Sequence, residues 1–179
     1  MDERAAKLRP VIRTRQYRSF TAEPVADDML EALADVARWT GSSRNSQPWR
    51  FVLLSDSELI RRIGELGHPQ TRSLHSATAA IAIVMPEDEG KGTGHAYDEG
   101  RAAERILIAA ELLGIGAGIA WIVPAIRPTI AELLGLPDGY YVRTIVAVGH
   151  PTDEARQPRS APGTARLPRD QVVMHGRWQ

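Results

Sequence analysis

The sequence contains no cysteine among its 179 residues. This absence excludes a disulfide scaffold, an iron–sulfur cluster, a thiolate zinc site and a cysteine nucleophile. An excess of one charge is also missing, since 22 lysines and arginines balance 22 aspartates and glutamates. Without a global electrostatic field, neither nucleic acid nor an anionic membrane is an expected partner. Any anion that the protein binds must be held by a local cluster of cations.

Long uninterrupted hydrophobic runs are absent as well. Residues 1–15 are charged and lack the apolar centre of a secretory signal. The most apolar stretch, residues 106–126, is interrupted by three glycines and Pro124, which fit a helix, a turn and a buried strand rather than a membrane span. We therefore expect a cytoplasmic protein with no membrane partner.

No catalytic set of side chains stands out in the sequence. The serines lack the strand–GxSxG–helix context of a hydrolase, and the glycine-rich stretch 114–118 follows a helix instead of opening one as a dinucleotide fingerprint does. The histidines, which show no pair at metal-ligand spacing, are His68, His75, His95, His150 and His175. We expect no metal site and no catalytic side chain, because a buried α/β protein of this kind often takes its chemistry from a cofactor.

Helical and strand patterns alternate along the chain, which predicts an α/β (α+β) fold. Helical periodicity covers residues 27–39, 56–66 and 98–113, and a short helix opens at Pro128 and closes at Gly135. Short apolar stretches predict strands at 51–54, 79–85, 117–123 and 142–148. Capping boxes are expected at Asp28–Glu31 and Ser55–Glu58. The pattern does not fix the direction of the strands.

The C-terminal residues differ in character from the rest. Residues 150–171 contain four prolines and four arginines, which predict an extended arm instead of a helix or a core. Such an arm must bury its few apolar side chains, Val172, Val173 and Trp178, against another surface. We therefore expect one domain over residues 1–179, with an arm over 150–179 and a dimeric assembly.

Two segments carry groups that suit a cofactor. The loop Thr40–Trp49 offers Ser42, Ser43 and Asn45, whose hydroxyl and amide groups can pair with the edge of a heteroaromatic ring. The same groups would equally well cap the preceding helix. An arginine cluster, Arg13, Arg15 and Arg18, suits a phosphate group, although such charges are more often solvated. Arg166 in the arm would either join that anion or face solvent.

Five segments taken in order resemble the nitroreductase family, and together they span almost the whole chain. RTRQYRSF (13–20) resembles the N-terminal arginine motif, and GSSRNSQPWRF (41–51) resembles the hallmark loop PSxxNxQPW, with Gly41 in place of proline. DEGRAAERILIAAELLGIGAGIAWI (98–122) resembles the central helix and glycine turn. LLGLPDGYYVRTIVAVGHP (133–151) and ARLPRDQVVMHGRW (165–178) resemble the last strand and the tail. The loop is the most specific of these matches.

The resemblance implies a three-layer α/β/α sandwich whose chain termini are exchanged in a homodimer, with FMN bound at the interface. It implies phosphate contacts from Arg13, Arg15 and Arg166, with Gln16 where many members have serine. The loop residues Ser42, Ser43 and Asn45 would reach the flavin of the partner subunit. Around the ring, the expected neighbours are Gln70, Ile119 and Trp121, with a backbone N–H near N5, and Arg18 as a cation beside the reduced ring.

The expected function is that of an FMN-dependent oxidoreductase. Hydride would pass from NAD(P)H through flavin N5 to an electron-poor small molecule such as a nitroaromatic or a quinone. One alternative is different flavin chemistry on the same fold, such as flavin cleavage, dehalogenation or dehydrogenation. A second is a flavin-binding or interaction protein without turnover.

Overall fold

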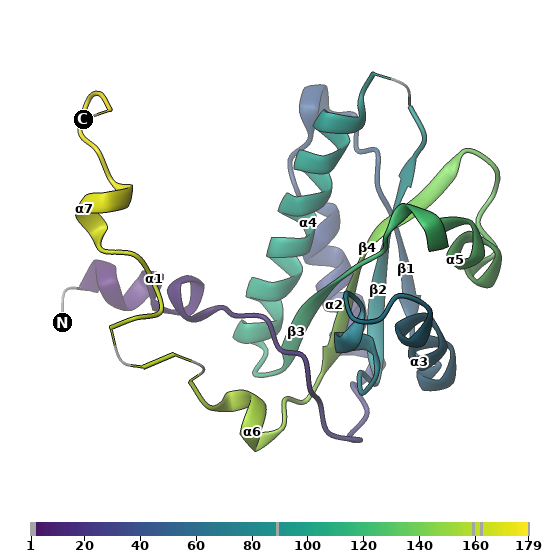
Figure 1. Cartoon of the computed structure of the whole chain (residues 1–179), viewed down its shortest axis with the longest axis horizontal. Helices are drawn as coiled ribbons and strands as arrows, with labels where there is room; N and C mark the ends of the chain where they lie inside the picture. The colour runs from purple at the N-terminus through teal and green to yellow at the C-terminus, as the bar shows by residue number, and fades with distance from the viewer. Residues whose placement is uncertain (1–2, 89, 159, 162, 179) are drawn as a thin grey trace.

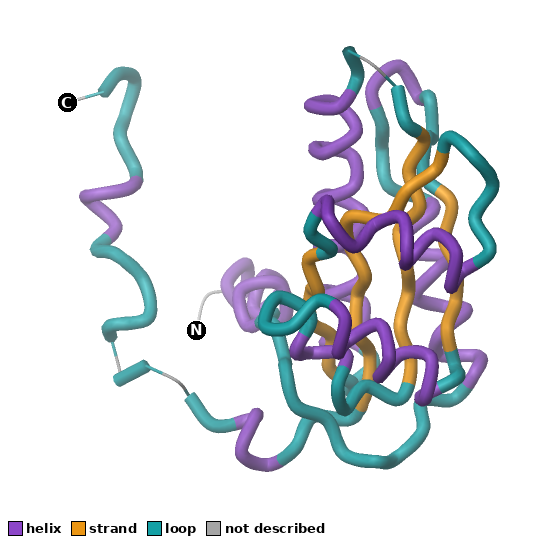
Figure 2. Tube along the Cα trace, turned by 45° about the vertical axis from the view of Figure 1, so that its right-hand side comes forward, coloured by secondary structure: helices purple, strands orange, loops and turns teal. Residues whose placement is uncertain are grey.

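The computed structural model describes residues 3–88, 90–158, 160–161 and 163–178. A four-stranded sheet flanked by helices forms the body of the molecule. The C-terminal segment projects well away from it (Figure 1). Seen from a second direction, the helices lie on both sides of the strands (Figure 2). The chain therefore has a layered body and a separate tail.

The sheet is antiparallel throughout. Its strands are β1 (Arg50–Leu54), β2 (Ala79–Pro86), β3 (Gly116–Trp121) and β4 (Tyr140–Gly149), arranged in the order β1-β2-β4-β3. The two central strands are almost wholly buried because each has a neighbour on both edges and a helical layer on both faces. This geometry explains why their sequences are continuous apolar runs, and it supplies the strand direction that the pattern left open.

Two helical layers cover the sheet. α2 (Asp27–Arg38) and α4 (Gly92–Leu112) pack on one face, and α3 (Ser57–Leu66) and α5 (Arg127–Leu134) pack on the other. Residues of β2 alternate between the two layers, as the period of two in a strand requires: Ile81 and Ile83 face α4, and Ala82 faces α3. The expected three-layer sandwich is confirmed.

Helix boundaries differ from the sequence expectation at their starts. α3 begins at Ser57, and its cap is Asp56, whose carboxylate accepts the N–H groups of Glu58 and Leu59. The capping box expected at Ser55 is therefore wrong by one residue. α2 has no side-chain cap, so the box at Asp28 is also wrong.

The central helix α4 also starts earlier than expected. It begins at Gly92 instead of Asp98. The sequence missed this start because Gly92 and Gly94 lower the local helix propensity, and His95 is the first residue of the helix that is buried. A different helix, α5, ends as expected at Gly135, which takes a φ of 62°. Even α4, at 21 residues, is not apolar enough to cross a bilayer, and neither is any other helix in the described part of the chain.

The two chain ends bury almost nothing. α1 (Glu3–Arg13), a helix that the sequence did not predict, has no buried residue and contains Pro10. In the arm, expected to be extended, α6 (Asp153–Arg156) and α7 (Arg169–Val172) each form a single turn without a buried residue. Ile12 is 74% exposed and Trp178 is 84% exposed.

The segment after α1 is attached to the edge of the sheet. The Tyr17 N–H donates to the carbonyl of Ala117 at 2.8 Å, and Phe20 forms an isolated bridge with Pro151. The approach is close enough that a Cβ on Gly118 would lie 1.9 Å from the carbonyl oxygen of Tyr17. β3 therefore fixes the backbone that carries the N-terminal arginines.

Candidate functional site

A cavity of about 460 Å³ lies where the N-terminal segment passes the arm. Arg13, Arg15 and Gln16 line it from one end of the sequence, and Arg166 lines it from the other. Three guanidinium groups around one cavity suit a phosphate, because each presents a planar fork of donors to the anion oxygens. The fold thus gathers four of the residues that the sequence singled out.

Arg15 plays a different part from the other two arginines. Its guanidinium donates to the carbonyl oxygens of Ala155 and Gln157, both at 3.2 Å, and to that of Arg156. It also lies over the ring of Tyr17, 4.9 Å from the centroid. Most of its donors are therefore used to hold the arm against the N-terminal segment. Arg15 shapes the cavity, and Arg13 and Arg166 face it with donors to spare.

A second cavity of about 460 Å³ adjoins the first. The two share Ala155 and Pro158 as lining residues, and the second is lined by Arg18 and Arg72. Arg72 was missed in the sequence, where its only signal is its position two residues after Gln70. A ligand with a phosphate at one end and an electron-accepting ring at the other would meet cations at both ends.

The edge strand β3 is joined to both glutamines that the sequence singled out. The Ile119 N–H donates to the side-chain oxygen of Gln16 at 3.2 Å, and the Trp121 N–H donates to the backbone carbonyl of Gln70 at 3.3 Å. Both N–H groups are thus engaged within the chain, so Gln16 must turn away before the Ile119 N–H can meet a ligand.

A bulge in the sheet directs Arg143 toward α4. Ile83 pairs with Thr144 and Val84 pairs with Val142, which leaves Arg143 between them. Its guanidinium donates to Glu99 Oε2 at 2.6 and 2.8 Å and lies 5.9 Å from the centroid of the Trp121 ring. This ion pair, with side chains 16% and 2% exposed, holds the Arg143 guanidinium near the ring of Trp121, which is itself 47% exposed.

The polar loop between α2 and β1 has a strained backbone. Arg44, Asn45 and Gln47 take φ values of 52°, 55° and 47°, a left-handed conformation that costs about 1–3 kcal/mol per residue without glycine. Internal bonds hold this shape: the Gln47 N–H donates to Ser42 Oγ at 2.9 Å, and the Gln47 amide donates to Asn45 Oδ1 at 3.3 Å. The loop is therefore folded into a defined shape before any ligand arrives.

Within one chain this loop and the arginines line different cavities. Ser43 and Arg44 line a space of about 620 Å³ together with Lys91, His95 and Asp98. The residues that line the arginine cavities come from other parts of the sequence. If both groups contact the same ligand, they must therefore come from two copies of the chain.

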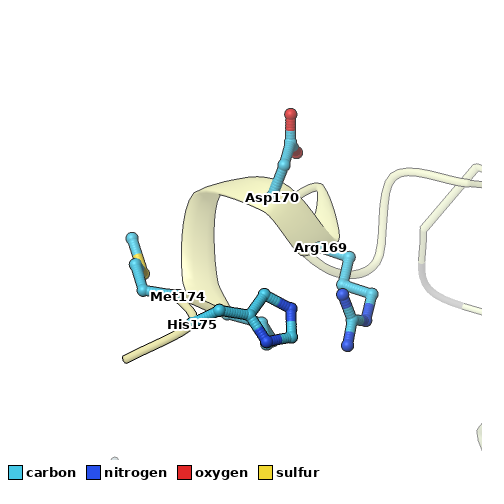
Figure 3. A pocket seen from close by; sticks show the side chains of 5 residues that line it. Arg169, Asp170, Met174 and His175 are labelled. Atoms are coloured by element: carbon cyan, nitrogen blue, oxygen red, sulfur yellow. The ribbon is translucent and has the colours of Figure 1, made fainter. Parts of the chain in front are cut away.

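The arm carries a third kind of cavity, of about 510 Å³, around α7. Figure 3 shows Arg169 and His175 beside one another and Asp170 pointing away from them. All its lining residues belong to the arm, so it is a surface without an opposing wall instead of a closed site. Among the described residues, no three His, Asp or Glu side chains gather as metal ligands.

Comparison with known proteins places this arrangement in a family. A model described as "Nitroreductase family" matches residues 11–84, which hold the arginine motif, the polar loop and Gln70. An FMN reductase [NAD(P)H] of Bacillus subtilis is 30% identical over 165 residues, covering 81% of this chain and 66% of that protein. The chain belongs to the nitroreductase family. A relative from Archaeoglobus fulgidus, provisionally named an NADH dehydrogenase/NAD(P)H nitroreductase, is 29% identical over 154 residues, covering 82% of this chain and 86% of that one.

Solved structures of nitroreductase-like proteins share the fold. The NADPH:FMN oxidoreductase of Vibrio harveyi, solved with NAD+, superposes with a TM-score of 0.77 at 24% identity, covering 95% of this chain and 78% of that one. An FMN-dependent nitroreductase of Clostridium difficile gives a TM-score of 0.79 at 21% identity, covering 94% and 98%. The four-stranded sheet and its two helical layers are therefore the nitroreductase fold.

Proposed function

We propose that this protein is an FMN-dependent NAD(P)H oxidoreductase that reduces an electron-poor small molecule, such as a nitroaromatic or a quinone. The observation that carries the proposal is the cavity lined by Arg13, Arg15, Gln16 and Arg166. The relatives named as an FMN reductase [NAD(P)H] and an NADPH-flavin oxidoreductase support it. When bound, FMN supplies the hydride chemistry at its N5, which the side chains of this protein cannot supply.

The chemistry of the donor set fits the phosphate of FMN. Arg13 and Arg166 come from opposite ends of the chain and face one cavity, and Arg15 holds these two segments together. In this proposal Arg13 and Arg166 bind the phosphate, and the amide of Gln16 contacts the same end of the cofactor. Arg18 and Arg72, in the adjoining cavity, would hold negative charge at the ring end.

We further propose that the working unit is a homodimer. The polar loop with Ser42, Ser43 and Asn45 lies at a different cavity from the arginines of its own chain, so it would serve the flavin of the partner. Residues 1–179 would then act as one FMN-binding domain whose arm, residues 150–179, docks on the other copy. Gln70, Ile119 and Trp121 would border the ring, and the cytoplasmic location stays a prediction.

Steady-state oxidation of NADH and NADPH tests the reaction. With nitrofurazone or a quinone as acceptor, the FMN-loaded protein should oxidise NADH, NADPH or both at a rate that depends on the acceptor concentration. Reduction of the bound flavin without turnover on these acceptors would favour the other flavin reactions. A protein that keeps FMN but is not reduced by either nicotinamide would favour a flavin-binding protein without turnover.

Replacing Arg166 tests the phosphate site. Arg166→Ala should raise the FMN dissociation constant about 10- to 100-fold, because a charge-assisted hydrogen bond to phosphate contributes about 1.5–3 kcal/mol. Arg62→Ala, which removes the same charge from the exposed side of α3 outside both arginine cavities, is the matched control and should leave the constant unchanged. Flavin fluorescence titration measures the dissociation constants of both variants. Equal affinities would show that Arg166 does not bind the phosphate.

A further inference from the structure

Three side chains of α4 contact the backbone that leads into the polar loop. The Arg105 guanidinium donates to the carbonyl of Trp39 at 2.8 Å. Asp98 Oδ2 accepts the N–H of Ser43 at 3.2 Å. Between these contacts, the guanidinium of Arg101 lies against Gly41, where a Cβ would be 2.9 Å from its Nη2. The segment 39–43 therefore meets α4 at three successive points.

The spacing of these contacts shows that the segment runs along the helix. Positions 98, 101 and 105 are three and four residues apart, so their side chains form one stripe on α4. The contacted positions 43, 41 and 39 follow in the reverse order along the chain. Two residues of extended chain and one helical turn cover similar distances, roughly 6.6 and 5.4 Å. One face of α4 thus supports the entry to the loop.

Asp98 is the member of this stripe that reaches the loop itself. Its side chain is only 5% exposed, and a buried carboxylate is costly unless its charge and its hydrogen bonds are satisfied. Oδ2 meets the Ser43 N–H, and Oδ1 lies 3.6 Å from Nη1 of Arg101. The mechanism proposed above uses neither Asp98 nor Arg101.

Position 41 supports this description. The guanidinium of Arg101 occupies the space that a side chain at position 41 would need. The hallmark loop that this segment resembles has proline there, whereas this chain has glycine. The absence of a side chain at Gly41 therefore lets Arg101 pack against the loop while it faces Asp98.

We propose that Asp98, supported by Arg101, is a positioning residue that holds the loop 41–47 in the shape in which Ser42 and Asn45 meet the flavin of the partner. The inference rests on the proposed function for the identity of the ligand. The left-handed residues Arg44, Asn45 and Gln47 follow directly after the Ser43 N–H that Asp98 holds. Loss of this anchor frees the strained backbone to relax.

The first test needs no flavin. Arg44 is exposed, so trypsin can cut the flavin-free protein after this residue whenever the loop loosens. Asp98→Ala should speed this cut, followed as the fragments that end at Arg44, by about 10-fold or more, since a hydrogen bond to a buried charge is lost. Asp98→Asn keeps an acceptor oxygen for the Ser43 N–H and should restore most of the protection. An Asp98→Ala protein cut no faster than the wild type would overturn the proposal.

The exposed pair Glu58–Arg61 on α3 supplies a matched control. It has the same spacing of three residues as Asp98–Arg101 but lies in solvent, on a helix that covers the other face of the sheet from α4. Glu58→Ala should leave the cut after Arg44 unchanged. If Asp98→Ala does not fold, Arg101→Gln replaces it and should speed the same cut by a smaller factor. An unchanged rate in Arg101→Gln would count against the proposal.

The second test measures FMN binding. The FMN dissociation constant should rise about 10-fold in Asp98→Ala and about 3-fold or less in Asp98→Asn, with an altered visible spectrum of the bound flavin in the alanine variant. A wild-type protein that binds no FMN would contradict the proposed function, but the proteolysis experiment would still test whether Asp98 holds the loop. Wild-type affinity and spectrum in Asp98→Ala would remove the positioning role and leave the function intact.

Discussion

The central strands and the chain ends of this protein differ completely in burial. Seven of the eight residues of β2 are buried, because both edges and both faces of the strand are covered within one chain. α1 and α7 have no buried residue. Two apolar side chains of the ends, Ile12 in α1 and Trp178 after α7, are largely exposed. One copy of the chain thus completes the sandwich but leaves its ends uncovered. The same ends carry Arg13 and Arg166, so we expect the cofactor site to need the second copy.

Removing the end of the arm should have the largest effect. Deleting residues 165–179 removes Arg166, Val172 and Val173, and should abolish both the dimer and FMN retention while the sandwich still unfolds cooperatively. Analytical ultracentrifugation, visible absorbance and far-UV circular dichroism measure the three properties. A truncated protein that remains dimeric and yellow would show that residues 165–179 are needed neither for the dimer nor for FMN retention.

Matched isoleucine truncations should separate the two regions by stability. Ile83→Ala, in β2, should lower the free energy of unfolding by about 2–5 kcal/mol, because it leaves a cavity between the sheet and α4. Ile12→Ala, on exposed α1, should change it by about 0.5 kcal/mol or less in the separated chain. Urea denaturation of both variants tests this, and a large cost for Ile12→Ala would show that α1 is part of the core.

Matched glycine substitutions should act in opposite directions at the attachment between body and N-terminal segment. Gly118→Ala places a Cβ against the Tyr17 carbonyl and should cost about 1–3 kcal/mol while weakening FMN binding, because the backbone carrying the arginines is displaced. Gly100→Ala, with open space around it in α4, should instead stabilise the protein by about 0.5–1 kcal/mol. Thermal unfolding and FMN titration of both variants check this. A Gly118→Ala protein with wild-type FMN affinity would show that the contact between β3 and the Tyr17 backbone does not influence FMN binding.

The sequence predicted the body of the fold because its signals are local. Continuous apolar runs located β2 and β4 to within two residues, and Gly135 marked the end of α5. The start of α4 was wrong because Gly92 and Gly94 oppose a helix in the local sequence, although the helix begins at Gly92 and buries His95 in its first turns. Antiparallel strand order was not predictable, since the same apolar runs would also suit parallel strands.

The site was less predictable because its parts meet only in three dimensions. The cavity shared by Arg13 and Arg166 was anticipated through the family resemblance and not through spacing. The use of Arg15 to hold the arm depends on backbone carbonyls that leave no trace in the sequence. Asp98 was missed because a carboxylate within a helical pattern normally indicates a solvated face.

The visible absorption spectrum of the purified protein, recorded before and after loading with FMN and desalting, is the most direct test of FMN binding by this protein. A flavin spectrum should survive desalting, because Arg13 and Arg166 would hold the phosphate and a second copy would cover the ring. A protein that stays colourless after loading, although folded and dimeric, would contradict the assignment of these cavities to FMN.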